Sequence, residues 1–447
     1  MAIVENHVQW LSVCEPPEPV EGNLFVSAYP PFSCWQADCS SEFERVLQSS
    51  PDKRGDAPLG LYVHIPFCLQ RCQFCYYRSI ANPASDTIDS YLDALIHEIR
   101  LYGESPRLKG RKLAFVYFGG GTPALLSPGQ MQRLFRELQS VFPWCDIQEV
   151  TFECSPKTVT RDRLETLHAA GVTRISMGAQ QLNDDVLRQS GRIHLVDDIR
   201  RAYDEIRQHH FDVVNIDLMV GLVGETEQSF FESLHQVISM NPDSITFYQL
   251  EIPANTPLFH ALHEGQISSL AGWDMKRQRL TDAFAQLESE GYTLRSAYAA
   301  VRDPARHRFH YQEMQYRGAD LLGTGLASFG YLGGMHYQNQ ASMREYSESL
   351  AAGRLPYKRG YVLDDEERMV REFVLQLKLG RVETQYFSSK FGVNVAEHFR
   401  EQLRRFANRG WLSPDAGAVT LTRQGLLRVD RLLPAFYRSE HRDLSYW

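Results

Sequence analysis

The chain has 447 residues, which at about 150 residues per domain indicates two or three domains. It is 43% hydrophobic and 23% charged, the composition of a globular protein with a buried core. The net charge of −8 argues against a general nucleic-acid or membrane-surface binder, and no apolar run approaches the roughly 18 residues of a membrane span. The first thirty residues contain no Lys or Arg, unlike a secretory signal, so we expect a cytoplasmic protein with reduced thiols.

Residues 1–58 predict an irregular N-terminal extension that lies on the next domain as a lid. The segment contains several prolines and an aromatic stretch from Phe25 to Trp35. Residues 1–44 hold seven acids and no Lys or Arg.

Residues 59–345 predict an α/β domain in which strands and helices alternate. The expected strands are Leu61–Ile65, Leu113–Phe118, Glu149–Glu153, Arg174–Met177, Val213–Leu218 and Ser244–Leu250. The expected helices are Asp89–Tyr102, Pro128–Val141, Arg161–Ala169, Val196–His209, Glu227–Ile238 and Met275–Leu287. This alternation predicts a parallel sheet with helical crossovers. Six such units favour a partial (β/α)6 TIM-type barrel, with its chemistry at the carboxyl ends of the strands.

Residues 346–447 predict a C-terminal domain of the winged-helix-like type. Glu367–Lys378 and Val395–Phe406 have helical patterns, and Val419–Leu421 resembles a short strand. Arginines are frequent here, but acids are interspersed among them. We therefore expect a lid or docking module rather than a DNA-binding domain.

A cysteine cluster is the strongest chemical signal. Cys68, Cys72 and Cys75 directly follow the first predicted strand. Three thiolates do not complete a zinc tetrahedron, but they can hold three corners of a [4Fe–4S] cluster and leave the fourth iron open. The alternatives are a zinc loop completed by a distant Cys or His, or three unrelated thiols. The C-x3-C-x2-C spacing favours the cluster and is the signature of the radical S-adenosylmethionine (SAM) superfamily.

A glycine run follows the second predicted strand, at Gly119-Gly120-Gly121-Thr122-Pro123. Glycine lets the backbone approach a ligand closely. Alone the run is compatible with a simple turn. One βα unit after the cysteines, it indicates a site for the methionine end of SAM.

Several ordered motifs together resemble the HemN-like branch of radical SAM enzymes. They include Tyr62-Val-His-Ile-Pro-Phe-Cys68, Phe118-Gly-Gly-Gly-Thr-Pro123, Arg174-Ile-Ser-Met-Gly-Ala-Gln180 and Asp320-Leu-Leu-Gly-Thr-Gly325. The resemblance runs from about Phe25 to Tyr437, nearly the whole chain. It implies a [4Fe–4S] cluster, two SAM molecules and a C-terminal HemN-like domain. It also implies a flavodoxin- or ferredoxin-type electron donor.

The resemblance also implies roles for individual residues. Tyr62, Gly120 and Glu153 would hold SAM near the cluster, and Phe74 would pack on adenine. The residues that would complete the paired SAM sites are Gly121, Thr122, Gln180, Arg192, Asp217, Leu250 and Phe329. Tyr62, Glu153 and Arg192 are our candidates for catalytic side chains.

Three reactions compete within this branch. One is that of the oxygen-independent coproporphyrinogen III dehydrogenase, which oxidatively decarboxylates two propionates. The second possibility is a haem-carrying chaperone. The third is a class C methylase or cyclopropanase, in which the radical activates the methyl group of the second SAM for transfer to an sp² carbon.

Departures from the branch decide our expectation. The dehydrogenase has a further cysteine where this chain has Tyr77, and the chaperone has an acid where this chain has Tyr76. The absence of Lys and Arg from residues 1–44 argues against a substrate with four carboxylates. Four aromatic residues suit a flat apolar substrate, although they could equally tether the extension: Phe25, Tyr29, Phe32 and Trp35. We therefore expect methylene transfer to an aromatic or apolar small molecule, of the kind found in natural-product biosynthesis.

Overall fold

A computed structural model describes residues 25–50, 57–267, 270–414, 417–442 and 444 of the chain. Cys14 and the first half of the predicted extension lie outside these residues. Within them, no helix is both long enough and apolar enough to cross a lipid bilayer.

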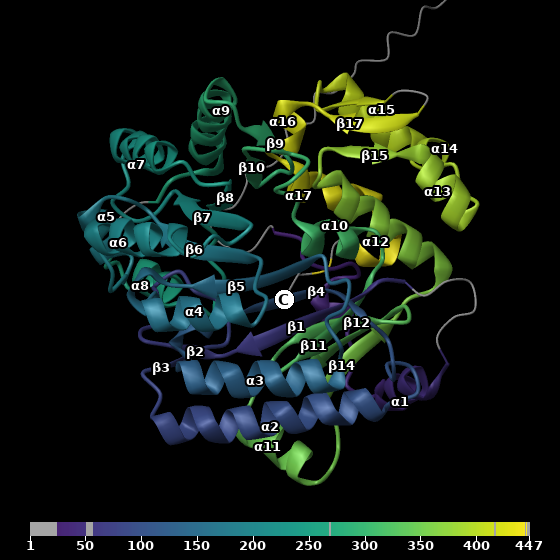
Figure 1. The fold of residues 1–447 in the computed structure, drawn as a ribbon. Helices are drawn as coiled ribbons and strands as arrows, with labels where there is room; N and C mark the ends of the chain where they lie inside the picture. Colours follow the sequence, from purple (N-terminus) through teal and green to yellow (C-terminus); the bar gives the residue numbers. More distant parts are fainter. Residues whose placement is uncertain (1–24, 51–56, 268–269, 415–416, 443, 445–447) are drawn as a thin grey trace, which may run out of the picture.

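A parallel sheet forms the centre of the molecule and confirms the α/β prediction (Figure 1). All six predicted strands are present and adjacent in chain order: β1 (Leu59–Ile65), β4 (Leu113–Gly120), β5 (Glu149–Cys154), β6 (Arg174–Gln180), β7 (Val213–Val220) and β8 (Ser244–Gln249). Their outward side chains, such as Val150 and Phe152 of β5, are buried beneath the helices. Thr151 and Glu153 alternate with them and point into the barrel, as the strand period of two requires.

The sheet continues past both edges of this six-stranded core. On the β1 side, β11 (Asp320–Thr324) pairs in parallel, followed by three antiparallel strands: β12 (Phe329–Leu332), β13 (Met335–Asn339) and β14 (Tyr357–Val362). Beyond β8 lie β10 (Ala299–Val301) and β9 (Thr293–Leu294), both antiparallel. In the described chain, β14 and β9 end the sheet without pairing to each other, so the barrel is an open arc. A two-stranded pair, β2 (Phe67–Cys68) and β3 (Ile80–Ala81), lies at the cysteines.

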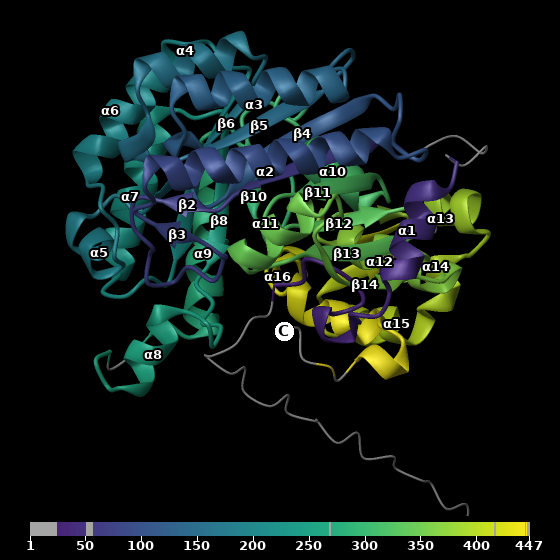
Figure 2. The same cartoon turned by 90° about the horizontal axis from the view of Figure 1, so that it is seen from below.

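Amphipathic helices cover the outer face of the arc (Figures 1 and 2). They are α2 (Ser85–Glu104), α3 (Pro128–Val141), α4 (Arg161–Ala169), α6 (Val196–Arg207), α7 (Glu227–Met240) and α9 (Trp273–Ser289). The start of α3 follows from its sequence, because Ser127 and Gln130 form a capping box before Pro128. Helix α2 begins four residues earlier than predicted, after Ala84, whose side chain cannot cap it.

Shorter helices fill the connections. They are α1 (Ser40–Gln48), α5 (Asp184–Gln189), α8 (Pro257–His263), α10 (His310–Tyr316) and α11 (Met343–Ala351). Figure 2 shows α8 projecting from the body of the molecule.

The C-terminal domain combines short helices with a small sheet. It contains α12 (Asp365–Leu377), α13 (Thr384–Phe391), α14 (Val395–His398), α15 (Arg400–Asn408), α16 (Arg423–Leu426), α17 (Val429–Leu432) and the strands β15 (Arg381–Glu383), β16 (Leu412–Pro414) and β17 (Ala418–Leu421). The predicted helix Val395–Phe406 is interrupted at Phe399, which leaves the helical conformation (φ −104°, ψ 22°) and packs 4.6 Å from Phe373. The boundaries at 58/59 and 345/346 stay predictions, although β14 pairs with the barrel sheet.

Candidate active site

A cavity opens at the carboxyl ends of the parallel strands, where the sequence places the chemistry. All six strands contribute to its wall, through residues near their carboxyl ends or through the segments that follow them. Trp273 and Arg277 of α9 add to one side, Phe25 comes from the N-terminal segment, and Arg428 and Arg431 come from the C-terminal domain. The cavity is therefore enclosed by three parts of the chain that lie far apart in sequence.

The cysteine loop forms one wall of this cavity. Cys68, Cys72 and Cys75 all line it and are half-buried. The loop is fixed from outside, since the Gln73 N–H donates to the Ser190 carbonyl at 3.2 Å and Arg71 donates to the Asn255 carbonyl at 3.0 Å. Among the described residues, no three His, Cys, Asp or Glu side chains lie close enough together to bind a single metal ion.

The thiols of Cys68 and Cys75 are protonated when no metal centre is bound. Burial raises the pKa of Cys75 to about 12, and burial also raises the pKa of Cys68. Thiols with such pKa values are protonated at neutral pH, so cluster binding must displace their protons. Arg192 donates towards Cys72 Sγ at 2.8 Å, and the Thr122 hydroxyl lies 3.7 Å from Cys68 Sγ. Both contacts favour sulfur that carries negative charge.

The glycine loop lies directly against the cysteine strand. Gly120 has φ +112°, and a Cβ there would lie 2.6 Å from the His64 ring. A Cβ at Gly121 would lie 2.6 Å from the Phe67 carbonyl oxygen and 3.0 Å from Cys68 Sγ. The loop can approach the cysteines only because neither position has a side chain, which explains the glycine run physically.

Two buried carboxyl groups lie deeper in the cavity. Burial raises the pKa of Glu153 to about 7, and Tyr117 donates a hydrogen bond of 2.6 Å to it. Burial, and secondly the negative charge of Glu153, raises the pKa of Asp217 to about 7. Each group can therefore change its charge near neutral pH or be held ionised by a cationic ligand such as SAM.

Three buried polar atoms in residues of the cavity wall have no hydrogen-bond partner within the described protein: Gln180 Oε1, Arg192 Nε and Gln249 Oε1. Buried polar atoms normally have a partner, so these are suited to a polar ligand or to water. Gln180 also adopts φ +71°, which is uncommon for a residue with a side chain. The donor set, the close glycine loop and the thiols together fit SAM beside an iron–sulfur cluster. No motif in the sequence indicated Gln249.

Most of the predicted site residues line the cavity. They are Cys68, Cys72, Phe74, Cys75, Gly120, Gly121, Thr122, Glu153, Gln180, Arg192 and Asp217. Tyr62, Leu250 and Phe329 do not. The Tyr62 hydroxyl lies 3.2 Å from His64 Nδ1, Leu250 is 2% exposed in an apolar cluster, and the Phe329 ring lies 4.4 Å from that of Phe32. The roles of all these residues in binding SAM stay predictions.

The N-terminal aromatic residues differ from the predicted substrate surface. Only Phe25 lines the cavity. Tyr29, Phe32 and Trp35 are buried; the Tyr29 ring lies 4.7 Å from Tyr437, and the Trp35 ring is stacked 4.9 Å from His336. These three side chains therefore tether the N-terminal segment to β13 and the C-terminal domain.

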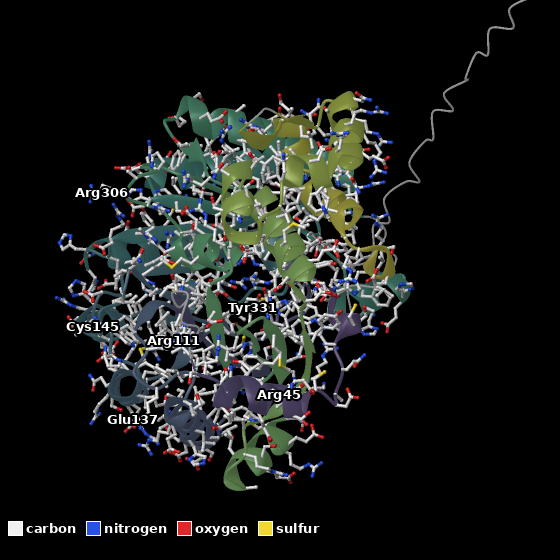
Figure 3. The ribbon with its side chains drawn as sticks, turned by 90° about the vertical axis from the view of Figure 1, so that its right-hand side faces the viewer. Arg45, Arg111, Glu137, Cys145, Arg306 and Tyr331 are labelled. Atoms are coloured by element: carbon white, nitrogen blue, oxygen red, sulfur yellow. The ribbon has the colours of Figure 1, made fainter. Side chains whose placement is uncertain are left out.

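The remaining described cysteines lie apart from the cluster loop. The Cys154 side chain is buried in the main apolar core, and Cys145 is exposed at the edge of the molecule (Figure 3). Neither has a disulfide partner, as expected for reduced thiols.

Comparisons with known proteins agree with this geometry. The chain matches the Radical SAM superfamily over residues 62–237 and the HemN C-terminal domain over residues 363–428. It is 30% identical to the haem chaperone HemW of Haemophilus influenzae, over 86% of this chain and 99% of that protein. It is 29% identical to the oxygen-independent coproporphyrinogen III oxidase of Escherichia coli, over 88% of each. The solved structure of the Escherichia coli coproporphyrinogen III oxidase (HemN) superposes with a TM-score of 0.81 at 27% identity, covering 94% of this chain and 99% of that one.

The fold, the cysteine loop and these matches define a radical SAM enzyme. The chain belongs to the HemN-like family of that superfamily, as predicted. This membership assigns a [4Fe–4S] cluster and two molecules of SAM as its cofactors.

The expectation of methylene transfer is wrong. The relatives are coproporphyrinogen III oxidases and haem chaperones. The error has a structural reason: the absence of Lys and Arg from residues 1–44 does not describe the cavity. Its cations come from the cysteine loop, the loop after β6, α9 and the C-terminal domain.

Proposed function

We propose that this protein is a radical SAM enzyme that oxidatively decarboxylates propionate side chains of a porphyrinogen. The similarity to coproporphyrinogen III oxidases supports this choice. The observation that carries it is the charge of the cavity wall, which contains five arginines: Arg71, Arg192, Arg277, Arg428 and Arg431.

These arginines suit a substrate with several carboxylates. A guanidinium binds a carboxylate through two parallel hydrogen bonds, and coproporphyrinogen has four carboxylates to place. Four carboxyl groups also line the cavity: Glu153, Asp217, Glu251 and Asp430. Asp430 forms an ion pair of 2.8 Å with Lys378, and burial makes Glu153 and Asp217 hard to ionise. The wall therefore contains one arginine more than it has carboxyl groups, and one of those carboxyl groups is already paired.

In this proposal the arginines and the aromatic residues of the cavity have different functions. When bound, the cluster and SAM supply a 5′-deoxyadenosyl radical, and conversion of a propionate to a vinyl group removes one hydrogen atom, one electron and CO₂ from the substrate. The arginines would orient propionates towards the cysteine loop. Tyr77, Tyr248 and Trp273 would cover the rings and keep water away from the radical.

The electron for SAM cleavage must come from outside the chain. A flavodoxin- or ferredoxin-type donor is part of the proposal, and a one-electron acceptor takes the electron that leaves the substrate. Leu69, within the cysteine loop, is 38% exposed, and Ile193 beside the cavity is 37% exposed. These side chains offer an apolar contact for such a carrier close to the cluster ligands.

A haem chaperone is the second candidate function. It is favoured by the match to HemW proteins over 98% and 99% of their lengths. Tyr77 also replaces the further cysteine of the dehydrogenase, which weakens the first candidate.

An anaerobic assay separates the two candidates. The holoenzyme is incubated with SAM, reduced flavodoxin and coproporphyrinogen III, and products are identified by mass spectrometry. Decarboxylation predicts a product that has lost two carboxyl groups, together with 5′-deoxyadenosine. Unchanged coproporphyrinogen with tight, SAM-independent haem binding would instead establish the chaperone.

A further inference from the structure

A second, smaller cavity lies inside the barrel, directly beneath Asp217. Its volume is about 40 Å³, and it shares Ser176, Asp217 and Tyr248 with the candidate active site above. Much of its wall is polar, with Thr151, Ser176, Asn215, Ser244 and Thr246 projecting from four adjacent strands. Parallel-barrel interiors are usually filled by branched apolar side chains, so this polar layer requires an explanation.

Hydrogen bonds in this layer converge on one carboxylate. Asn215 Nδ2 donates to Asp217 Oδ1 at 2.7 Å, and the Ser176 hydroxyl lies 3.4 and 3.3 Å from the two Asp217 oxygens. Asn215 is itself held from β8, because the Thr246 hydroxyl donates to Asn215 Oδ1 at 3.0 Å. Asn215 also donates to the Ser176 oxygen at 2.9 Å. The amide is therefore fixed in one orientation, with its donors facing Asp217 and Ser176.

An orphaned hydroxyl in the same cavity points to bound water. Thr151 Oγ1 is buried and has no hydrogen-bond partner within the described protein, although Thr151 lines the cavity. A buried hydroxyl without a partner costs about 1–3 kcal/mol, which ordered water would remove. A volume of about 40 Å³ has room for water, and the polar wall supplies its partners.

We propose that Asn215 is a positioning residue that holds the Asp217 carboxylate, above a water-filled polar layer, in the orientation that receives SAM. This inference rests on Asp217 facing bound SAM, and it is independent of which tetrapyrrole is the substrate. Asn215 does not itself line the candidate active site, and it acts through Asp217, which does.

The effect of Asn215 on Asp217 can be measured through the pKa of the Asp217 carboxyl group. Burial raises the pKa of Asp217 to about 7, whereas the hydrogen bonds from Asn215 and Ser176 lower it. Titratable or charged groups that act on it include Tyr117, Glu153, Cys154, Arg174 and Tyr248. The wall of the smaller cavity also contains Arg295, His307 and Glu313. Loss of the Asn215 donor removes a stabilisation of the ionised form, so the pKa of Asp217 must rise further.

The test is the pH dependence of SAM binding by the reconstituted holoenzyme, measured by anaerobic calorimetry between pH 6 and pH 9 without any tetrapyrrole. For the unaltered protein we expect affinity to rise through pH 7, and for Asp217→Asn we expect a smaller rise, because the Glu153 carboxyl also has a pKa of about 7. Asn215→Leu should move the part of the rise that belongs to Asp217 to higher pH. From a starting pKa of about 7, a gain of one pKa unit should lower affinity at pH 7 by up to about fivefold, and affinity should recover at pH 9.

Ser176→Ala is the second variant, because it removes only a hydroxyl and guards against a folding defect in Asn215→Leu. It should move the profile in the same direction by less. Ser244→Ala is the matched control, since Ser244 lines the cavity but makes no hydrogen bond to Asp217 within the described residues, and its profile should not move. An unaltered pH profile in both Asn215→Leu and Ser176→Ala would overturn the inference. Failure of the decarboxylation proposal would leave it untouched, because no tetrapyrrole is involved.

Discussion

At the scale of single residues, the site depends on two glycines that lack a Cβ atom and on buried polar atoms that have no partner within the described protein. The missing Cβ atoms of Gly120 and Gly121 let the loop after β4 lie against the cysteine strand. Gln180 Oε1 and Gln249 Oε1 have no hydrogen-bond partner within the described protein, so both can accept a hydrogen bond from a ligand. The cysteines and glycines could be predicted from spacing alone because they are close in sequence. Gln249 and Arg431 could not be predicted, because only the complete fold brings them into the same cavity wall as Cys68.

The cluster ligands give the first prediction. Cys68→Ala removes one of three thiolates and should abolish the [4Fe–4S] signal in anaerobic electron paramagnetic resonance of the reduced protein. Cys145→Ala, at an exposed cysteine far from the loop, should keep the full signal. A full signal in Cys68→Ala would refute the assignment of the ligands.

The glycine loop gives the second prediction. Gly120→Ala places a methyl group against His64 at a positive φ, and strain of this kind costs about 1–3 kcal/mol. We expect that loss in the free energy of unfolding measured with denaturant, together with weaker SAM binding. Gly129→Ala, on α3 with no atom near its Cβ, should leave stability unchanged or raise it slightly. Equal behaviour of the two variants would show that the close approach at Gly120 is unimportant.

The arginines of the cavity wall give the third prediction. Arg431→Ala should raise KM for coproporphyrinogen by about 10- to 100-fold, because a charge-assisted hydrogen bond is worth about 1.5–3 kcal/mol. Formation of 5′-deoxyadenosine without substrate should not change. Arg404→Ala, an exposed arginine on α15 of the same domain, is the control and should keep the original KM. An unchanged KM in Arg431→Ala would remove this side chain from the substrate site.

At the scale of elements, the strands that could be predicted are those with buried apolar side chains at alternate positions or in longer runs. β1, β4, β5, β6, β7 and β8 are covered by helices on their outer face, which gives a strong sequence signal. β11 to β13 follow one another through a glycine-rich segment whose pattern resembles loops. The break between α14 and α15 was missed because Phe399 fits a helical pattern, while its burial against Phe373 decides its conformation.

A buried ion pair joins three elements beside the active site and gives the fourth prediction. Lys378, at the end of α12, is fully buried, pairs with Asp430 of α17 at 2.8 Å and donates to the Val26 carbonyl. Asp430 also accepts from the Val26 N–H at 2.9 Å and from Tyr298. Lys378→Met leaves this carboxylate without its cation and should lower the free energy of unfolding by about 3–5 kcal/mol.

The double variant Lys378→Met/Asp430→Asn supplies the control for this pair. Removal of both charges avoids the unpaired buried carboxylate, so it should recover part of the stability lost in Lys378→Met. Denaturant unfolding of the four proteins completes the cycle. A coupling energy near zero would show that the pair does not hold the N-terminal segment in place.

At the scale of the whole molecule, the function depends on how distant segments meet. The parallel strands present the cysteines and carboxylates at one end, and the C-terminal domain adds Arg428 and Arg431 to the wall of the same cavity. The absence of Lys and Arg from residues 1–44 therefore does not indicate the charge of the site. Composition could indicate the fold class and the cofactors, but the substrate class depends on tertiary contacts.

The most direct test of this account is the stoichiometry of turnover. The holoenzyme is supplied anaerobically with SAM, a one-electron donor and acceptor, and coproporphyrinogen III labelled with ¹³C in its propionate carboxyl groups. The account predicts labelled CO₂ and 5′-deoxyadenosine in equal amounts, with no S-adenosylhomocysteine. Formation of 5′-deoxyadenosine without labelled CO₂, whatever the fate of the tetrapyrrole, would contradict it.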